Sequence, residues 1–252
     1  MSSLLQNLLA QNPNVHATAT SGLHEIMYLT KGFFKTSEFH ALPDPAIGEK
    51  MFMEYQRHGI AHAFDEVTDR PVVVDKSRSW IGSAGLLFKL FPDAKLLVPV
   101  RDIRGVLSSM EKKFQAHPEF QLEMQQQDTM KIQTVEGRCQ FWLNSAPVGI
   151  AIQRVHELAR LFNDKVHFVH AEDLTSDTQV TMNKVWEYLG LESHTHDINN
   201  VEQYTKEHEL GFPYGDHTIR PMVKPQRPDW HQVLGVNLSK QLGQQFDWIK
   251  QL

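Results

Sequence analysis

The segment from Lys95 to Glu111 constrains the fold of this chain more than any other. Its sequence is KLLVPVRDIRGVLSSME, in which a short apolar run ends at Arg101, the chain turns, and a helical pattern with two serines follows. A buried strand that leads directly into a helix is the unit from which α/β folds are built, and ligands bind beyond the carboxyl ends of their strands. Arg101 stands at that end, and Ser109 follows eight residues later. Because a guanidinium offers a fork of donors to phosphate oxygens and a hydroxyl can complete their coordination, the pair predicts a phosphate site. The alternative is a strand that ends in a surface arginine.

The rest of the chain repeats this alternation of strands and helices. Length and β-branching predict strands over 71–75, 95–100 and 166–169, with Pro99 at the end of the second. Helices are expected over 2–11, 49–64, 83–91 and 138–162, the last of them kinked at Pro147. A further helix is expected to begin after a cap at Ser176 or Asp177 and to stop at Gly190. The closing helix is expected to begin after a cap at Ser239. Residues 14–23 and 193–235 are expected to be loops, and 115–136 a mobile excursion or a solvated helix. We therefore predict a single α/β domain over 1–252, with three layers and a mostly parallel central sheet flanked by helices.

Composition narrows the class of protein. The net charge of −5 argues against a nucleic-acid surface, so an anionic ligand needs a local basic cluster, for which Arg101, Arg104, Lys112 and Lys113 are candidates. The single cysteine, Cys139, excludes an internal disulfide and suits a reducing, cytoplasmic compartment. An apolar run long enough to cross a membrane and a signal peptide are both lacking, so no membrane partner is expected.

Several segments, which follow one another in the order typical of the family and span most of the chain, together resemble sulfotransferases that use 3′-phosphoadenosine-5′-phosphosulfate (PAPS), in a bacterial-type branch of that family. Arg101 and Ser109 match the family's strand–turn–helix that binds the 3′-phosphate. The other matching segments are 4–13 with 16–23, DKSRSW at 75–80, HFVHAEDL at 167–174 with VWEYLGL at 185–191, and DHTIRP at 216–221. The resemblance implies a P-loop-like fold and a nucleotide donor, with adenosine 3′,5′-bisphosphate as the product.

One part of the family pattern is not found at the start of the sequence. The family begins with an apolar strand and a loop close to G-x-P-R-S-G-S-[ST]-L-L, which holds the 5′-phosphosulfate through backbone N–H groups. Ser2 and Ser3 match only its last two polar positions, so the chain is expected to be N-terminally truncated relative to the family. Two explanations stay open: a shortened form of an ordinary enzyme, which we favour, or a homologue that truly lacks the loop.

The resemblance also implies roles for particular residues. Sulfuryl transfer, like phosphoryl transfer, moves an anionic group in line between oxygens, so the protein supplies positioning and positive charge. Lys76 aligns with a lysine that serves tyrosylprotein sulfotransferases in this way, and Arg78 stands beside it. Arg220 and Lys224 lie in a segment that resembles the one folding over the nucleotide. The alternative for each of these cations is a solvated position on the surface.

The base that accepts the proton of the acceptor hydroxyl is harder to choose. The candidates are His24, Glu25 and His217, of which His217 and Glu25 are preferred, because histidine titrates near neutral pH and a glutamate serves in related enzymes. The chain has 14 histidines, so residue type alone does not decide among them. The segment His194-Thr-His196-Asp197 suggests a metal site, because alternate residues of a strand share one face, but no third and fourth ligand is apparent and no metal is expected.

The predicted function is therefore transfer of a sulfuryl group from PAPS to a hydroxyl of a small molecule, carbohydrate or peptide. The alternative is a catalytically silent homologue that binds PAPS or adenosine 3′,5′-bisphosphate. A nucleotide kinase would require G-x-x-x-x-G-K-[ST], which the sequence lacks. The acceptor and the oligomeric state stay open.

Overall fold

The computed structural model describes residues 1–117, 132–206, 218–226 and 228–252. The chain packs as two compact units, which we treat separately. The N-terminal unit comprises Ser2–Ala94 and Glu202–Glu207, and the C-terminal unit comprises Met1, Lys95–Val201 and His208–Leu252. The single domain expected over 1–252 stays a prediction.

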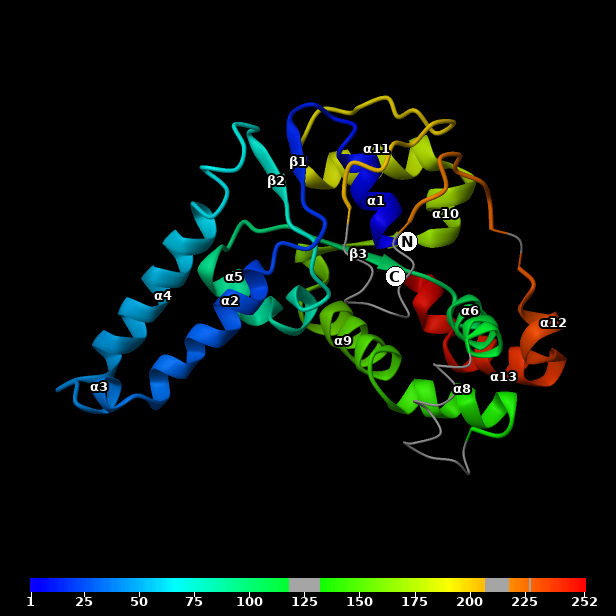
Figure 1. Ribbon diagram of the computed structural model, residues 1–252, viewed down its shortest axis with the longest axis horizontal. Coiled ribbons are helices and arrows are strands. Elements are labelled where there is room, and N and C mark those ends of the chain that lie inside the picture. Colours follow the sequence, from blue (N-terminus) through cyan, green and yellow to red (C-terminus); the bar gives the residue numbers. More distant parts are fainter. Residues whose placement is uncertain (118–131, 207–217, 227) are drawn as a thin grey trace. The chain divides into compact units, whose positions relative to one another are not determined.

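Two parallel strands form the centre of the C-terminal unit. Strands β3 (Leu96–Val100) and β4 (Val166–His170) pair in register from Leu96 opposite Val166 to Val100 opposite His170, and they lie side by side in Figure 1. Alternate residues of β3 are buried, as expected for a strand with one face on the core. Helix α6 (Ile103–Ala116) follows β3, and helices α10 (Ala171–Ser176) and α11 (Thr178–Leu189) follow β4. Because both strands run the same way, their carboxyl ends meet at one edge, where Arg101 and Glu172 lie just beyond them.

Helices enclose a core on one side of α6. Helix α6 contacts helices α8 (Val135–Asn144), α12 (Trp230–Leu234) and α13 (Val236–Gln245). The unit also contains α9 (Val148–Leu161) and the 3-10 helices η3 (Asn163–Lys165) and η5 (Asp247–Gln251). The buried residues at the centre of this cluster include Ile103, Leu107, Cys139, Trp142, Leu238 and Leu242. The burial of these apolar side chains anchors α6, and with it the turn after β3.

A buried ion pair also joins α6 to α8. The Arg138 guanidinium binds both carboxylate oxygens of Glu111, with Nε–Oε2 at 2.7 Å and Nη2–Oε1 at 2.6 Å, and donates to the Ile132 carbonyl at 2.7 Å. Gln115 donates to the same carboxylate at 2.8 Å. The Glu111 side chain is 0% exposed, so its charge depends on these partners.

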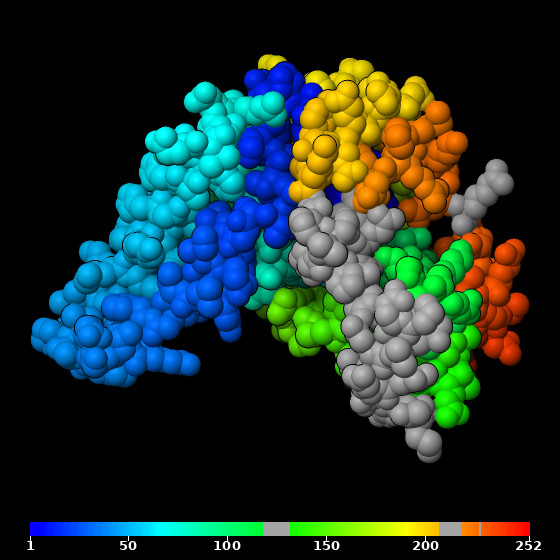
Figure 2. All heavy atoms as spheres, in the orientation of Figure 1, coloured from blue at the N-terminus to red at the C-terminus, as the bar shows by residue number. Residues whose placement is uncertain are grey.

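The N-terminal unit has its own parallel pair. Strand β1 (Val15–Ala17) pairs with β2 (Val72–Val74), and helix α1 (Ser2–Leu9) packs on β1. The buried Gln6 side chain of α1 donates to the Val74 carbonyl at 2.8 Å. Along the chain, β1 is followed by α2 (Leu23–Leu29), η1 (Thr30–Lys35), α3 (Ser37–His40) and α4 (Pro45–Ala61) before β2. The elements η2 (Trp80–Gly82) and α5 (Ala84–Leu90) follow β2. In Figure 2 the atoms of helices α2 to α4 are coloured in shades of blue.

The α/β class is confirmed, and five local predictions need correction. Helix α12 (Trp230–Leu234) lies within the segment 193–235 that was expected to be a loop. Part of the loop expected over 14–23 is strand β1, which backbone pairing with β2 stabilises. Pro99 lies inside β3, opposite Val169, rather than at its end. Pro147 separates two helices, α8 and α9, instead of kinking one. Ser239 is buried within α13, whose N-cap is Gly235. Gly190 does end α11, with φ of 71°, a conformation that glycine adopts without strain.

Candidate functional site

A hydrogen bond between a backbone N–H and a carboxylate joins the segments that follow β3 and β4. Asp102 is the N-cap of α6, where its side chain accepts from the Arg104 N–H at 2.9 Å. The Asp102 N–H in turn donates to Oε1 of Glu172, in the first turn of α10 after β4, at 3.1 Å. Arg101, immediately before the cap, is therefore held at the edge where ligands of α/β folds bind.

The Arg101 guanidinium lies directly against Gly105, in the first turn of α6. A Cβ atom at Gly105 would stand 2.8 Å from Nε and 3.1 Å from Nη2 of Arg101. The Nε atom is buried and has no hydrogen-bond partner among the described residues. Burial lowers the pKa of Arg101, against the opposing influence of Glu172, Asp102 and Asp229, but a guanidinium keeps its charge at any physiological pH. A charged donor group with an unused N–H at a strand end is suited to an anion.

Two serines of α6 lie one turn further along the helix. Ser109 is exposed and follows Gly105 by four residues, so it shares the helix face on which the Arg101 guanidinium rests. Ser108 is buried. The combination of Arg101, Gly105 and Ser109 is called the Arg101 cradle below. The role of Ser109 as a phosphate ligand stays a prediction.

Two other cations of the expected basic cluster are already neutralised by carboxylates. Arg104 binds Asp102 through two hydrogen bonds, at 2.9 and 2.5 Å, and its guanidinium stacks 4.5 Å from the centre of the Trp230 ring. Burial alone would raise the pKa of Asp102, but the hydrogen bonds from Arg104 outweigh it and the pKa is lowered. Lys112 forms an ion pair with Asp229. Arg104 and Lys112 remain near Arg101 in the sequence, but each is paired with a carboxylate, so little of their charge is available to a ligand.

A second set of polar groups lies at the carboxyl ends of β1 and β2, in the N-terminal unit. The Thr18 hydroxyl donates to Oδ1 of Asp75 at 3.0 Å and accepts from the Lys76 N–H at 2.9 Å. The indole N–H of Trp80 donates to the other oxygen of Asp75, Oδ2, at 2.7 Å. Lys76, the predicted cation, thus begins a loop whose backbone is fixed by its neighbours.

The candidate bases occupy different environments. His24 is buried in α2, where its Nε2 forms a hydrogen bond of 2.8 Å with the Ser83 hydroxyl and its ring meets Trp80 edge-on, 5.0 Å between ring centres. Glu25, next to it, is exposed in the first turn of the same helix. His217 lies outside the described residues.

The remaining predicted ligands lie on several elements. Ser2 is exposed and Ser3 buried in the first turn of α1, and Arg78 is exposed in the loop after β2. Arg220 and Lys224 are exposed in a segment that pairs with residues 198–201, through Val201 N–H to the Pro221 carbonyl and Val223 N–H to the Ile198 carbonyl. Their roles stay predictions.

The residues that suggested a metal site serve another purpose. His196 is buried and its Nε2 accepts from the Trp186 indole N–H at 3.0 Å. Within the described ranges, no group of three or more His, Cys, Asp or Glu side chains is placed to hold a metal ion. Over the same ranges, no helix has both the length and the apolar character that crossing a bilayer requires.

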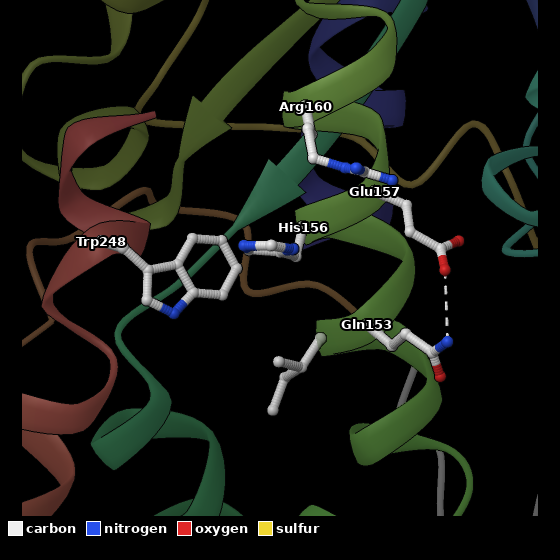
Figure 3. A pocket seen from close by; sticks show the side chains of 6 residues that line it. Gln153, His156, Glu157, Arg160 and Trp248 are labelled. Carbon is white, nitrogen blue, oxygen red and sulfur yellow. Dashed lines mark hydrogen bonds between the residues drawn. The ribbon is translucent and has the colours of Figure 1, made fainter.

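A groove of about 520 Å³ lies between α9 and η5, lined by Ile152, Gln153, His156, Glu157, Arg160 and Trp248. Figure 3 shows His156 beside the Trp248 indole, which it meets edge-on at 5.2 Å between ring centres. Glu157 accepts a hydrogen bond of 3.2 Å from Gln153. None of the predicted site residues lines this groove.

Sequence reasoning missed Gly105, Thr18 and Asp75 as parts of the candidate sites. A glycine four residues after Arg101 is visible in the sequence and could have suggested that the arginine needs room on the helix. Thr18 lies 57 residues from Asp75, and only the pairing of β1 with β2 brings the two together. No local signal could have found that contact.

Comparisons with known proteins agree with this architecture. A sequence model of the sulfotransferase family matches residues 2–196. Among solved structures, the sulfotransferase domain from the curacin biosynthetic pathway superposes with a TM-score of 0.51 at 14% sequence identity, covering 98% of this chain and 93% of that one. At this identity the likeness shows the fold, and it confirms the predicted P-loop-like α/β architecture. No curated protein matches the sequence significantly.

Proposed function

Because the chain belongs to the sulfotransferase family, we propose that it transfers a sulfuryl group from PAPS to a hydroxyl of an acceptor. In this reaction the acceptor oxygen forms a bond to sulfur while the bond from sulfur to the bridging phosphate oxygen breaks. The hydroxyl proton passes to a base, and adenosine 3′,5′-bisphosphate leaves. The work of the protein is to position the reactants and to stabilise negative charge.

The observation that carries the proposal is the Arg101 cradle. Its guanidinium has a buried N–H without a hydrogen-bond partner among the described residues and stands at the carboxyl end of β3. It rests on Gly105, where the helix has no side chain, on the same face as Ser109. A phosphate that accepts from this group gains a charge-assisted hydrogen bond and relieves an unpaired buried donor. We assign the cradle to the 3′-phosphate of the nucleotide, with Ser109 as the second ligand.

The other roles follow from the family resemblance. Lys76 is proposed to stabilise the bridging and sulfuryl oxygens. Arg78, two residues further along, is proposed to bind the nucleotide, together with Ser2, Ser3, Arg220 and Lys224. Glu25 and His217 are the proposed bases. The exposed carboxylate of Glu25 is accessible to a hydroxyl substrate, which supports its role as a base.

The buried, single cysteine supports a proposal about location. Cys139 has no second cysteine in the sequence with which to form a disulfide. Chains without disulfides are typical of reducing compartments, and we propose that the protein works in the cytoplasm.

Calorimetric titration with adenosine 3′,5′-bisphosphate tests the nucleotide assignment, with AMP as the control ligand. We expect micromolar binding that requires the 3′-phosphate, and a loss of at least tenfold in Arg101→Ala. Arg160→Ala is a matched control, because Arg160 is an exposed arginine of the same unit that takes no part in the cradle. Equal affinity for both ligands, or for Arg101→Ala and the unmodified chain, would contradict the assignment.

Turnover tests the catalytic assignment. Lys76→Ala should lower kcat more than it weakens donor binding, because a group that acts on the transition state contributes little to ground-state affinity. Binding of adenosine 3′,5′-bisphosphate without any transfer from PAPS would instead indicate a silent nucleotide-binding homologue.

A further inference from the structure

Three hydrogen bonds at the ends of β1 and β2 converge on the loop that carries Lys76. We propose that Thr18 and Asp75 are positioning residues for Lys76, an inference that rests on the proposed function of that lysine. They act through the backbone of the loop and do not touch the reacting atoms.

The Thr18 hydroxyl is used in both directions. It donates its proton to Oδ1 of Asp75 at 3.0 Å and accepts the Lys76 N–H at 2.9 Å. Thr18 is 8% exposed, so water does not readily replace either partner. A buried hydroxyl with both functions satisfied defines one orientation of the Lys76 peptide group, because rotating that peptide would leave its N–H without an acceptor.

Asp75 closes the loop at its other end. Its second oxygen, Oδ2, accepts the Trp80 indole N–H at 2.7 Å, and Trp80 is itself buried. The Asp75 carboxylate therefore binds Thr18, just after β1, and Trp80, just after the loop, so residues 76–79 lie between two fixed ends. The Trp80 ring is in turn fixed by its edge-on contact with His24, which is hydrogen-bonded to Ser83.

This arrangement suits a residue that must be placed accurately rather than bound tightly. A displacement of about 1 Å in a group that acts on a transition state can reduce the rate by about 100-fold. Long lysine side chains sample many rotamers, so a fixed backbone is the part of their placement that the fold can supply.

The proposal predicts a specific kinetic pattern. Thr18→Val keeps the shape of the side chain but removes the donor and the acceptor, and it should lower turnover of PAPS by about 10- to 100-fold. Thr18→Ser restores both functions and should return most of the rate. The turnover of Asp75→Asn should lie between those of Thr18→Val and Thr18→Ser, because the new NH₂ group must face one of the two donors that the carboxylate now accepts from. The affinity for adenosine 3′,5′-bisphosphate should change less than about twofold in all three, since Arg101 is untouched.

The assay is release of inorganic sulfate from radiolabelled PAPS with water as the acceptor, so that no acceptor need be known. Thr178→Val is the matched control: Thr178 is a buried threonine of the C-terminal unit whose hydroxyl donates to the Leu174 carbonyl at 2.8 Å. Its loss should not change turnover. Hydrogen exchange at the Lys76 amide gives a readout independent of activity and should accelerate in Thr18→Val but not in Thr178→Val.

A double-mutant cycle separates positioning from a purely structural role. If Thr18 acts through Lys76, Thr18→Val should cause no further loss of turnover in a Lys76→Ala background. Additive losses, or an unchanged rate in Thr18→Val when Lys76→Ala is impaired, would overturn the inference and leave the proposed function standing. A folded, unmodified chain that neither binds adenosine 3′,5′-bisphosphate nor releases sulfate would overturn the proposed function, and this inference with it.

Discussion

A single methyl group added at Gly105 should displace the Arg101 guanidinium without removing its charge. The new Cβ atom would stand 2.8 Å from Nε, 3.1 Å from Nη2 and 3.2 Å from Cζ of Arg101, all closer than ordinary van der Waals contact. These atoms belong to the end of a flexible side chain, whereas the helix backbone is anchored by the core, so the guanidinium is the part that moves. Gly105→Ala therefore tests the position of the arginine separately from its charge.

The same substitution should have opposite effects on stability and on binding. Gly105 lies in the first turn of α6 with a helical backbone, where alanine is favoured over glycine by up to about 1 kcal/mol. That gain corresponds to a rise in Tm of about 2–4 °C for a chain of this size. A hydrogen bond to a charged group contributes about 1.5–3 kcal/mol. Losing it at the 3′-phosphate weakens binding by about 10- to 150-fold.

Calorimetry with adenosine 3′,5′-bisphosphate and thermal unfolding measure the two effects on the same samples. Gly59→Ala in α4 is the matched control, because a Cβ atom there meets nothing within 4 Å, so it should leave affinity unchanged. In an Arg101→Ala background, Gly105→Ala should have no further effect on binding. Unchanged affinity in Gly105→Ala would refute the argument that this glycine seats the arginine.

Three further predictions concern the packing around α6. Glu111→Gln should lower the free energy of unfolding by about 3–5 kcal/mol, because it leaves the buried charge of Arg138 uncompensated; denaturant unfolding measures this. Burial, with the nearby Glu111 carboxylate, raises the pKa of Cys139 to about 12, so its thiol should resist iodoacetamide at pH 9 until the chain unfolds. Between pH values of about 8.5 and 12 the folded chain holds a proton on this thiol that the unfolded chain has lost. The contribution of the thiol to stability should therefore fall as the pH rises from about 8.5 towards 12. Arg104→Lys should lower the free energy of unfolding by about 1.5–3 kcal/mol, since it loses the bidentate ion pair with Asp102 and the stacking on Trp230. Denaturant unfolding measures this loss, and calorimetry should show that nucleotide affinity is retained.

The elements that could be predicted from the sequence are those with local signals. Strand β3 is a run of apolar residues of strand length, and most of β4 is a short segment of apolar and β-branched residues. The end of α11 at Gly190 follows from the tolerance of glycine for positive φ, and the observed φ is 71°. These signals depend on neighbouring residues and survive packing unchanged.

Elements that depend on distant partners could not be predicted in this way. Strand β1 is three residues long and contains His16, so its composition resembles a loop. It becomes a strand because β2, more than 50 residues later, offers backbone groups in register. Ser239 was expected to cap a helix on its residue type, yet packing buries it inside α13.

The candidate site shows the same division between local and distant information. The position of Arg101 at a strand end is a local property, and the sequence is sufficient to predict it. Which cations keep an unused donor is not: Lys112 is neutralised by Asp229, 117 residues away, and Arg104 stacks on Trp230 of α12. A count of basic residues near Arg101 therefore overstates the charge available to a ligand. The proposed anion site therefore depends on how the carboxylates are distributed. They neutralise Arg104 and Lys112, whereas the buried Nε of Arg101 has no hydrogen-bond partner among the described residues.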